Sequence, residues 1–112
     1  MFTQSIENQQ YGGGAKLQQK LTFVTAYIRR YWKVKPSALP QQKRTYVVSY
    51  LCLVCGFTQA RVAQYLRVSL RTVQRDCSTA RLLTKKSINF RAEIHCLKSY
   101  VDYYQNYCKH YE

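Results

Sequence analysis

Side chains that can bond to DNA bases recur along residues 70–83, at spacings that place them on one face of a helix. Arg71, Gln74 and Arg75 are the main candidates, because arginine can donate two hydrogen bonds to guanine and glutamine can reach base edges. The pattern therefore predicts a helix that reads base pairs. An amphipathic helix whose charged face is only solvated is the alternative, since patterns of this kind are short and degenerate.

Two short helices separated by a tight break are expected over residues 58–83. Thr58 can cap the first helix, because its hydroxyl oxygen can accept from a free backbone N–H group, and Val62 and Leu66 then face inward. Arg67–Ser69 forms the break, and the Ser69 side chain caps the second helix. This order is typical of a helix-turn-helix, in which the second helix reads the DNA.

Other side chains are expected to contact the DNA backbone. The candidates for phosphates, which position a protein on the duplex without carrying sequence information, are Lys43, Arg44, Arg61, Arg67 and Arg81. Thr58 and Ser69, at helix N-termini, can also present backbone N–H groups to phosphate. The main predicted DNA contacts are Lys43, Arg44, Thr58, Gln59, Arg67, Ser69, Arg71, Thr72, Gln74, Arg75, Ser78 and Arg81.

The charge of the chain also indicates a polyanionic partner. Its 112 residues include 18 basic and 5 acidic side chains, which gives a formal net charge of +13. No acidic residue lies between Glu7 and Asp76. Self-repulsion of this size favours nucleic acid as the partner, ahead of an anionic membrane surface or a merely solvated basic surface.

The remaining segments predict further helices. Apolar residues recur at helical spacing over residues 16–32 and in a last helix that begins near Ser87 or Asn89. Residues 41–55 are apolar around most of the helix and precede Gly56, so we expect a central helix that ends there. The predicted inward stripe of the first helix is Leu17, Leu21, Val24, Ile28 and Tyr31.

These elements predict an all-α fold, a compact helical domain of four to five helices that contains the helix-turn-helix. Residues 1–14 are polar and end in three glycines, and we expect a disordered N-terminal arm. Residues 15–112 are expected to form a single domain. The eleven tyrosines are expected mainly to pack between helices, rather than to stack on unpaired bases.

Catalysis and cofactors are not expected. Cys52-x-x-Cys55, His95-Cys96 and Cys108-x-His110 could be combined into a zinc site on paper, but the first pair lies within an apolar helix without a knuckle turn. We therefore expect no metal, no cofactor and no small-molecule substrate. Because no apolar run is long enough to span a membrane and no secretory signal is evident, we expect a cytoplasmic, nucleoid-associated protein with reduced cysteines.

The order of segments resembles the C-terminal DNA-binding domain of the DnaA replication initiators, in the superfamily that includes the Trp repressor. The resemblance covers roughly residues 17–104. It is carried by FVTAYIRRYWKVKPSAL, KRTYVVSYL, GFTQARVAQYL, Arg71-Thr72-Val73 and SINFRAEIHCLKSYV.

The resemblance implies DNA binding, with Arg44 and Thr72 at the two positions whose family counterparts contact DNA. The chain departs from the family at Val68-Ser69-Leu70, where the family has Arg-Asp-His, and we expect no nucleotide-driven motor domain. Residues 69–76 also resemble the recognition helix of DeoR-like repressors. Those proteins need a β-hairpin wing next, whereas this chain supplies another helix.

We therefore predict a non-catalytic, sequence-selective double-stranded DNA-binding protein that regulates transcription or replication, for example in a phage or mobile element. A protein-interaction module that uses its basic surface against an acidic partner is one alternative. The DNA-binding subunit of a recombinase or transposase is another. One such motif binds weakly alone, so a homodimer or a partner protein is expected to assist, with the tyrosine-rich C-terminal helix as the contact surface.

Overall fold

Apolar residues at helical spacing form helices along the whole described chain. The computed structural model describes residues 17–111, and every element within them is helical, which confirms the all-α fold with four to five helices. The predicted arm at residues 1–14 lies outside the described residues. The elements are a first helix (17–27) continuing as η1 (Ile28–Trp32), η2 (Pro36–Ala38), α2 (Gln41–Val48) continuing as η3 (Ser49–Val54), α3 (Gln59–Leu66), α4 (Leu70–Lys86) and α5 (Ile88–Tyr111).

The caps predicted for α3 and α4 are both present. The Thr58 hydroxyl oxygen accepts from the backbone N–H of Arg61 at 3.1 Å, and the Ser69 hydroxyl oxygen accepts from the N–H of Thr72 at 3.1 Å. Arg67 ends α3 in the left-handed region, with φ 57°. The predicted break at residues 67–69 is therefore confirmed, and it turns the chain from α3 into α4.

The other predicted helix boundaries also hold. Gly56 has φ 80°, a backbone conformation that a side chain would strain, so glycine suits the position after the central helix. Of the two candidates for the start of the last helix, Ser87 is the cap, because its hydroxyl oxygen accepts from the backbone N–H of Phe90 at 3.0 Å. Asn89 instead lies inside α5.

Two helices widen into π turns before they end. The N–H of Lys33 donates to the Ile28 carbonyl at 3.0 Å, and the N–H of Cys55 donates to the Tyr50 carbonyl at 2.9 Å. A turn closed over five residues holds more residues than an α turn, so later side chains are displaced around the axis. This explains why the prediction that Tyr31 faces inward is wrong: its side chain is 53% exposed.

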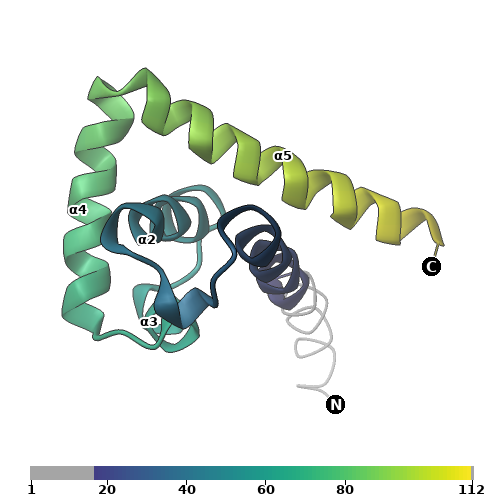
Figure 1. Cartoon of the computed structure of the whole chain (residues 1–112), viewed down its shortest axis with the longest axis horizontal. Helices are drawn as coiled ribbons and strands as arrows, with labels where there is room; N and C mark the ends of the chain where they lie inside the picture. Colours follow the sequence, from purple (N-terminus) through teal and green to yellow (C-terminus); the bar gives the residue numbers. More distant parts are fainter. Residues whose placement is uncertain (1–16, 112) are drawn as a thin grey trace, which may run out of the picture.

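The segment formed by α2 and η3 lies at the centre of the molecule, as the sequence predicted. Val47, Val48, Tyr50 and Leu51 are each at most 1% exposed. Figure 1 shows α4 along one side of this segment, α5 across its top and α3 below it. The other helices thus cover the apolar side chains around the central helix, and together they form one continuous core.

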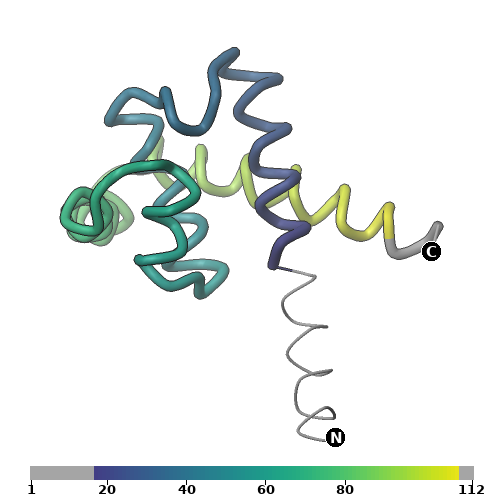
Figure 2. Tube along the Cα trace, turned by 90° about the horizontal axis from the view of Figure 1, so that it is seen from below, coloured from purple at the N-terminus to yellow at the C-terminus, as the bar shows by residue number. Residues whose placement is uncertain are grey.

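The first helix crosses under α5, on the side of the core away from α4 (Figures 1 and 2). Aromatic rings make this contact: Phe23 stacks on Tyr104 at 5.8 Å between ring centroids, and Tyr27 meets Tyr100 edge-on at 5.3 Å. These tyrosines pack between helices, as expected from their spacing. The first helix is also joined to α3, because the hydroxyls of Thr25 and Tyr65 share a hydrogen bond and Arg61 Nη2 donates to Gln18 Oε1 at 3.0 Å.

α5 has 24 residues and projects past the rest of the fold (Figure 1). Neither α5 nor any other helix of residues 17–111 has the length and apolar content needed to cross a bilayer. The projecting half exposes Tyr103 and Tyr107, at 63% and 51%. Its surface is therefore mixed, with packed rings on one side and exposed rings on the other.

We predict that Leu66→Ala destabilises the fold by about 2–5 kcal/mol, because it leaves a cavity in the core. Leu66 is fully buried at the end of α3, whereas Leu82 is 51% exposed on α4. Leu82→Ala, the same chemical change, should alter the free energy of unfolding by no more than about 0.5 kcal/mol. Urea unfolding followed by circular dichroism measures both, and equal losses would contradict the described core.

Candidate nucleic-acid interface

α4 forms one edge of the molecule (Figure 1), and its exposed residues include several arginines. Its inner face buries Val73, Asp76, Cys77 and Ala80, which lie within three or four residues of one another. Helical periodicity places the residues between them on the opposite side. Of the predicted contacts on α4, Thr72 is half-buried, and the exposed ones are Arg71, Gln74, Arg75, Ser78 and Arg81.

No carboxylate neutralises this face. Among residues 17–111, no ion pair involves Arg71, Arg75 or Arg81. Asp76 is the one acidic residue on α4, and it points inward. The three guanidinium groups therefore remain available to an outside partner, with their charge uncompensated within the described fold.

The predicted contacts at the helix starts have a structural role. Ser69 and Thr72 hydroxyls lie 2.9 Å apart and share one hydrogen bond, in addition to the cap of α4. Thr58 is likewise engaged in the cap of α3, and Gln59 beside it is half-buried. These hydroxyl groups order the N-termini of α3 and α4 and so fix where the basic side chains of α4 begin.

Arg44 is anchored to α4 rather than extended into solvent. Its Nε donates to Asp76 Oδ2 at 2.6 Å and its Nη2 to Oδ1 at 3.3 Å, and the two side chains are 19% and 4% exposed. Asp76 thus forms its ion pair with Arg44, across 32 positions, rather than with neighbouring Arg75.

Lys43 lies on a pair of aromatic rings beside that ion pair. Its Nζ is 5.0 Å from the Trp32 ring centroid and 5.7 Å from that of Tyr46. Such contacts hold an ammonium group by attraction to the ring faces, at about 0.5–1 kcal/mol where water has access. The half-buried lysine therefore has a defined position near the start of α2.

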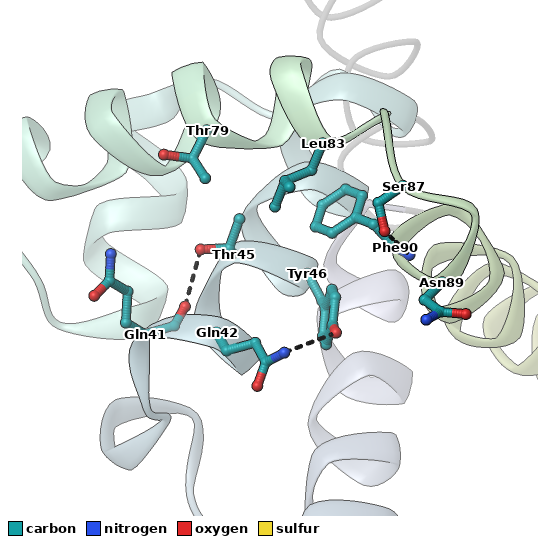
Figure 3. A pocket seen from close by; sticks show the side chains of 9 residues that line it. All are labelled: Gln41, Gln42, Thr45, Tyr46, Thr79, Leu83, Ser87, Asn89 and Phe90. Atoms are coloured by element: carbon teal, nitrogen blue, oxygen red, sulfur yellow. Dashed lines mark hydrogen bonds between the residues drawn. The ribbon is translucent and has the colours of Figure 1, made fainter. Parts of the chain in front are cut away.

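A pocket of about 450 Å³ opens between α2, α4 and the start of α5 (Figure 3). No charged side chain lines it, and Gln42 Nε2 donates to the Tyr46 hydroxyl at 3.4 Å across its floor. Gln41 and Thr79 bring neutral polar groups to its edge next to α4. Nothing in the sequence indicates that these two residues meet, because Gln41 lies 38 positions before Thr79 and follows a proline-rich turn.

Half-buried Cys52 and buried Cys77 are neighbours where η3 packs against α4. Burial raises the pKa of Cys52 to about 12, with Cys77 beside it, so the thiol stays protonated at neutral pH. Cys52 thus has Cys77 as its neighbour, rather than the Cys55 of its sequence motif. Among the side chains described, those of residues 17–108, no three of His, Cys, Asp or Glu come together as a metal site.

Comparison of the chain with family models, with curated proteins and with solved structures gave no match. The DnaA-like resemblance therefore rests on the sequence segments alone.

We predict that Asp76→Ala destabilises the fold by about 3–5 kcal/mol, because it leaves the largely buried Arg44 guanidinium without its partner. Asp102→Ala is the matched control. Its ion pair with Lys98 is an exposed contact within α5, so its loss should leave the free energy of unfolding almost unchanged. Urea unfolding at neutral pH compares the two variants, and a similar cost for both would show that the Arg44–Asp76 pair does not join α2 to α4.

Proposed function

We propose that the chain is a non-catalytic, sequence-selective double-stranded DNA-binding protein. In this proposal α3, the break and α4 act as a helix-turn-helix, and α4 enters the major groove. The observation that carries the proposal is the outward face of α4, where Arg71, Arg75 and Arg81 are exposed without a carboxylate partner among the described residues.

The dimensions of α4 agree with this role. At 17 residues the helix is about 26 Å long, and the major groove admits a helix of ordinary diameter. In helix-turn-helix complexes the N-terminal residues of the second helix contact base edges. Arg71 and Arg75 lie within the first two turns and are assigned to bases, with Gln74 between them.

The anchored cations are assigned to phosphates. Lys43 on its aromatic rings and Arg44 in its ion pair are held near the start of α2, which packs against α4. Side chains with fixed positions lose little conformational entropy when they bind. Phosphate contacts of this kind set the register of the protein on the duplex, whereas the exposed arginines of α4 supply specificity.

We propose that the protein is a cytoplasmic, nucleoid-associated regulator of transcription or replication, for example one encoded by a phage or mobile element. Pairing with a second copy or another protein through α5 would add affinity. The exposed rings of Tyr103 and Tyr107 are the surface assigned to that contact.

A second candidate function is binding to an acidic protein. Leu70 and Leu82 are 45% and 51% exposed among the arginines of α4. Apolar side chains within a basic face suit a protein partner that presents carboxylates around an apolar patch. They also suit thymine methyl groups in a DNA duplex.

We predict that the purified protein enriches a common motif from random duplexes and that its affinity falls steeply with salt. Each phosphate neutralised should add about −0.9 to the slope of log K against log salt. Titration of selected duplexes by fluorescence anisotropy provides the measurement. Absence of duplex binding near physiological salt would reject the DNA proposal in favour of an acidic protein partner.

We predict that Arg71→Ala or Arg75→Ala weakens binding to the preferred duplex by about 1–3 kcal/mol and relaxes the preference at one base pair. Arg30→Ala removes the same charge from η1, where the guanidinium lies 5.6 Å from the Tyr31 ring centroid, and serves as the control. Repeating the selection with each variant tests the assignment. If both α4 variants keep the affinity and motif of the unchanged protein, α4 does not read the bases.

A further inference from the structure

A small basic pocket lies where the break before α4 meets the end of the first helix. Its volume is about 260 Å³. Three cationic side chains line it, and each comes from a different segment of the chain: η1, the turn before η2, and the end of α3. The lining residues are Arg29, Lys35, Pro36, Ser37, Tyr65 and Arg67.

The pocket contains positive charge without a compensating anion. No carboxylate lines it, and within residues 17–111 no ion pair involves Arg29, Lys35 or Arg67. Burial raises the pKa of Tyr65 to about 12, so its hydroxyl stays neutral and bonds to Thr25 Oγ1 at 2.5 Å. Three like charges that converge in this way repel one another unless an anion binds between them.

The backbone at two of the three cations, Lys35 and Arg67, is constrained by the fold. Arg67 adopts φ 57°, and its N–H donates to the Gln64 carbonyl at 3.3 Å. Pro36 begins η2 directly after Lys35, and η2 packs against α3. Because proline restricts the backbone and α3 supports the turn, the position of Lys35 beside Arg67 belongs to the fold and not to a free loop.

Size and chemistry select the ligand. Pockets that enclose whole small molecules usually measure about 300–1,000 Å³, so this pocket suits a single phosphate group better than an entire nucleotide. Arginine donors match phosphate oxygens, and Lys35 and Ser37 add an ammonium and a hydroxyl donor.

We infer that this pocket binds a phosphate group of the DNA backbone next to the base pairs contacted by α4. Arg67 precedes Arg71 by four residues, so their Cα atoms are at most about 14 Å apart. A phosphate in the pocket would therefore lie within a few base pairs of the Arg71 contact. The inference rests on the proposed function, and it adds Arg29 and Lys35 as two DNA-contacting residues outside α3 and α4.

The test compares two double variants of the full chain. Arg29→Gln/Lys35→Gln removes two cations of the pocket, whereas Arg30→Gln/Lys33→Gln removes two neighbouring cations that do not line it. Both lower the net charge equally. The pocket variant should weaken binding to all duplexes alike by at least about fivefold and reduce the salt slope by about 0.9, because the pocket holds one phosphate. The control should change the slope by less than half as much.

A titration with inorganic phosphate, followed by NMR, tests the pocket without DNA. The side-chain signals of Arg29 and Arg67 should shift in the unchanged protein and in the control variant, and the Arg67 shift should be much smaller in the pocket variant. Thermal melting verifies that both variants are folded. These two readouts separate a phosphate site from general attraction of DNA to a basic surface.

Each outcome has one meaning. Equal effects of the two double variants on DNA binding, with no phosphate shifts, overturn the pocket but leave the proposed function intact. Phosphate shifts at Arg29 and Arg67 without duplex binding retain a phosphate site, but they overturn DNA as its source and the proposed function with it. A selective loss in the pocket variant together with the phosphate shifts supports the inference.

Discussion

The buried ion pair between Arg44 and Asp76 determines how α4 presents its surface. Asp76 is 3% exposed, and its carboxylate is joined to the central helix through both oxygens. A buried carboxylate without a partner is costly, so α4 cannot rotate about its axis without losing this pair. With Asp76 fixed inward beside Val73 and Cys77, helical periodicity turns Arg71 and Arg75 outward. The core thereby sets the direction of the basic face.

The Arg44–Asp76 pair also leaves the basic face of α4 without a neutralising carboxylate. Asp76 is bound by Arg44 and Asp102 by Lys98, which leaves Glu93 as the one described carboxylate outside an ion pair. Glu93 lines an aromatic pocket between η1 and α5, so it is not available to the arginines of α4. The repulsion among those arginines is therefore balanced by solvent, ions or a partner, which is the physical basis for proposing a polyanion.

Features of the fold that depend on neighbouring residues could be predicted from the sequence, whereas contacts between residues far apart in the sequence could not. The caps at Thr58 and Ser69 and the stop at Gly56 depend on backbone groups within three residues, so residue type was sufficient. The Arg44–Asp76 pair spans 32 positions and has no signature in the spacing of charges. The exposure of Tyr31 was missed because a π turn changes the helical phase, which apolar periodicity does not reveal.

The candidate site also combines residues that a local sequence pattern indicated with residues that only the fold brings together. The two groups have different roles in the proposed recognition of DNA. Its exposed arginines lie on one helix, where a pattern of types and spacings was visible in the sequence. The cations around Arg67 converge from segments that only the fold brings together, so Arg29 and Lys35 carried no signal. Base contacts need a rigid helix, whereas phosphate contacts need only a charge at the right place on the surface. In the proposed complex, specificity is therefore local in sequence, while positioning depends on the tertiary structure.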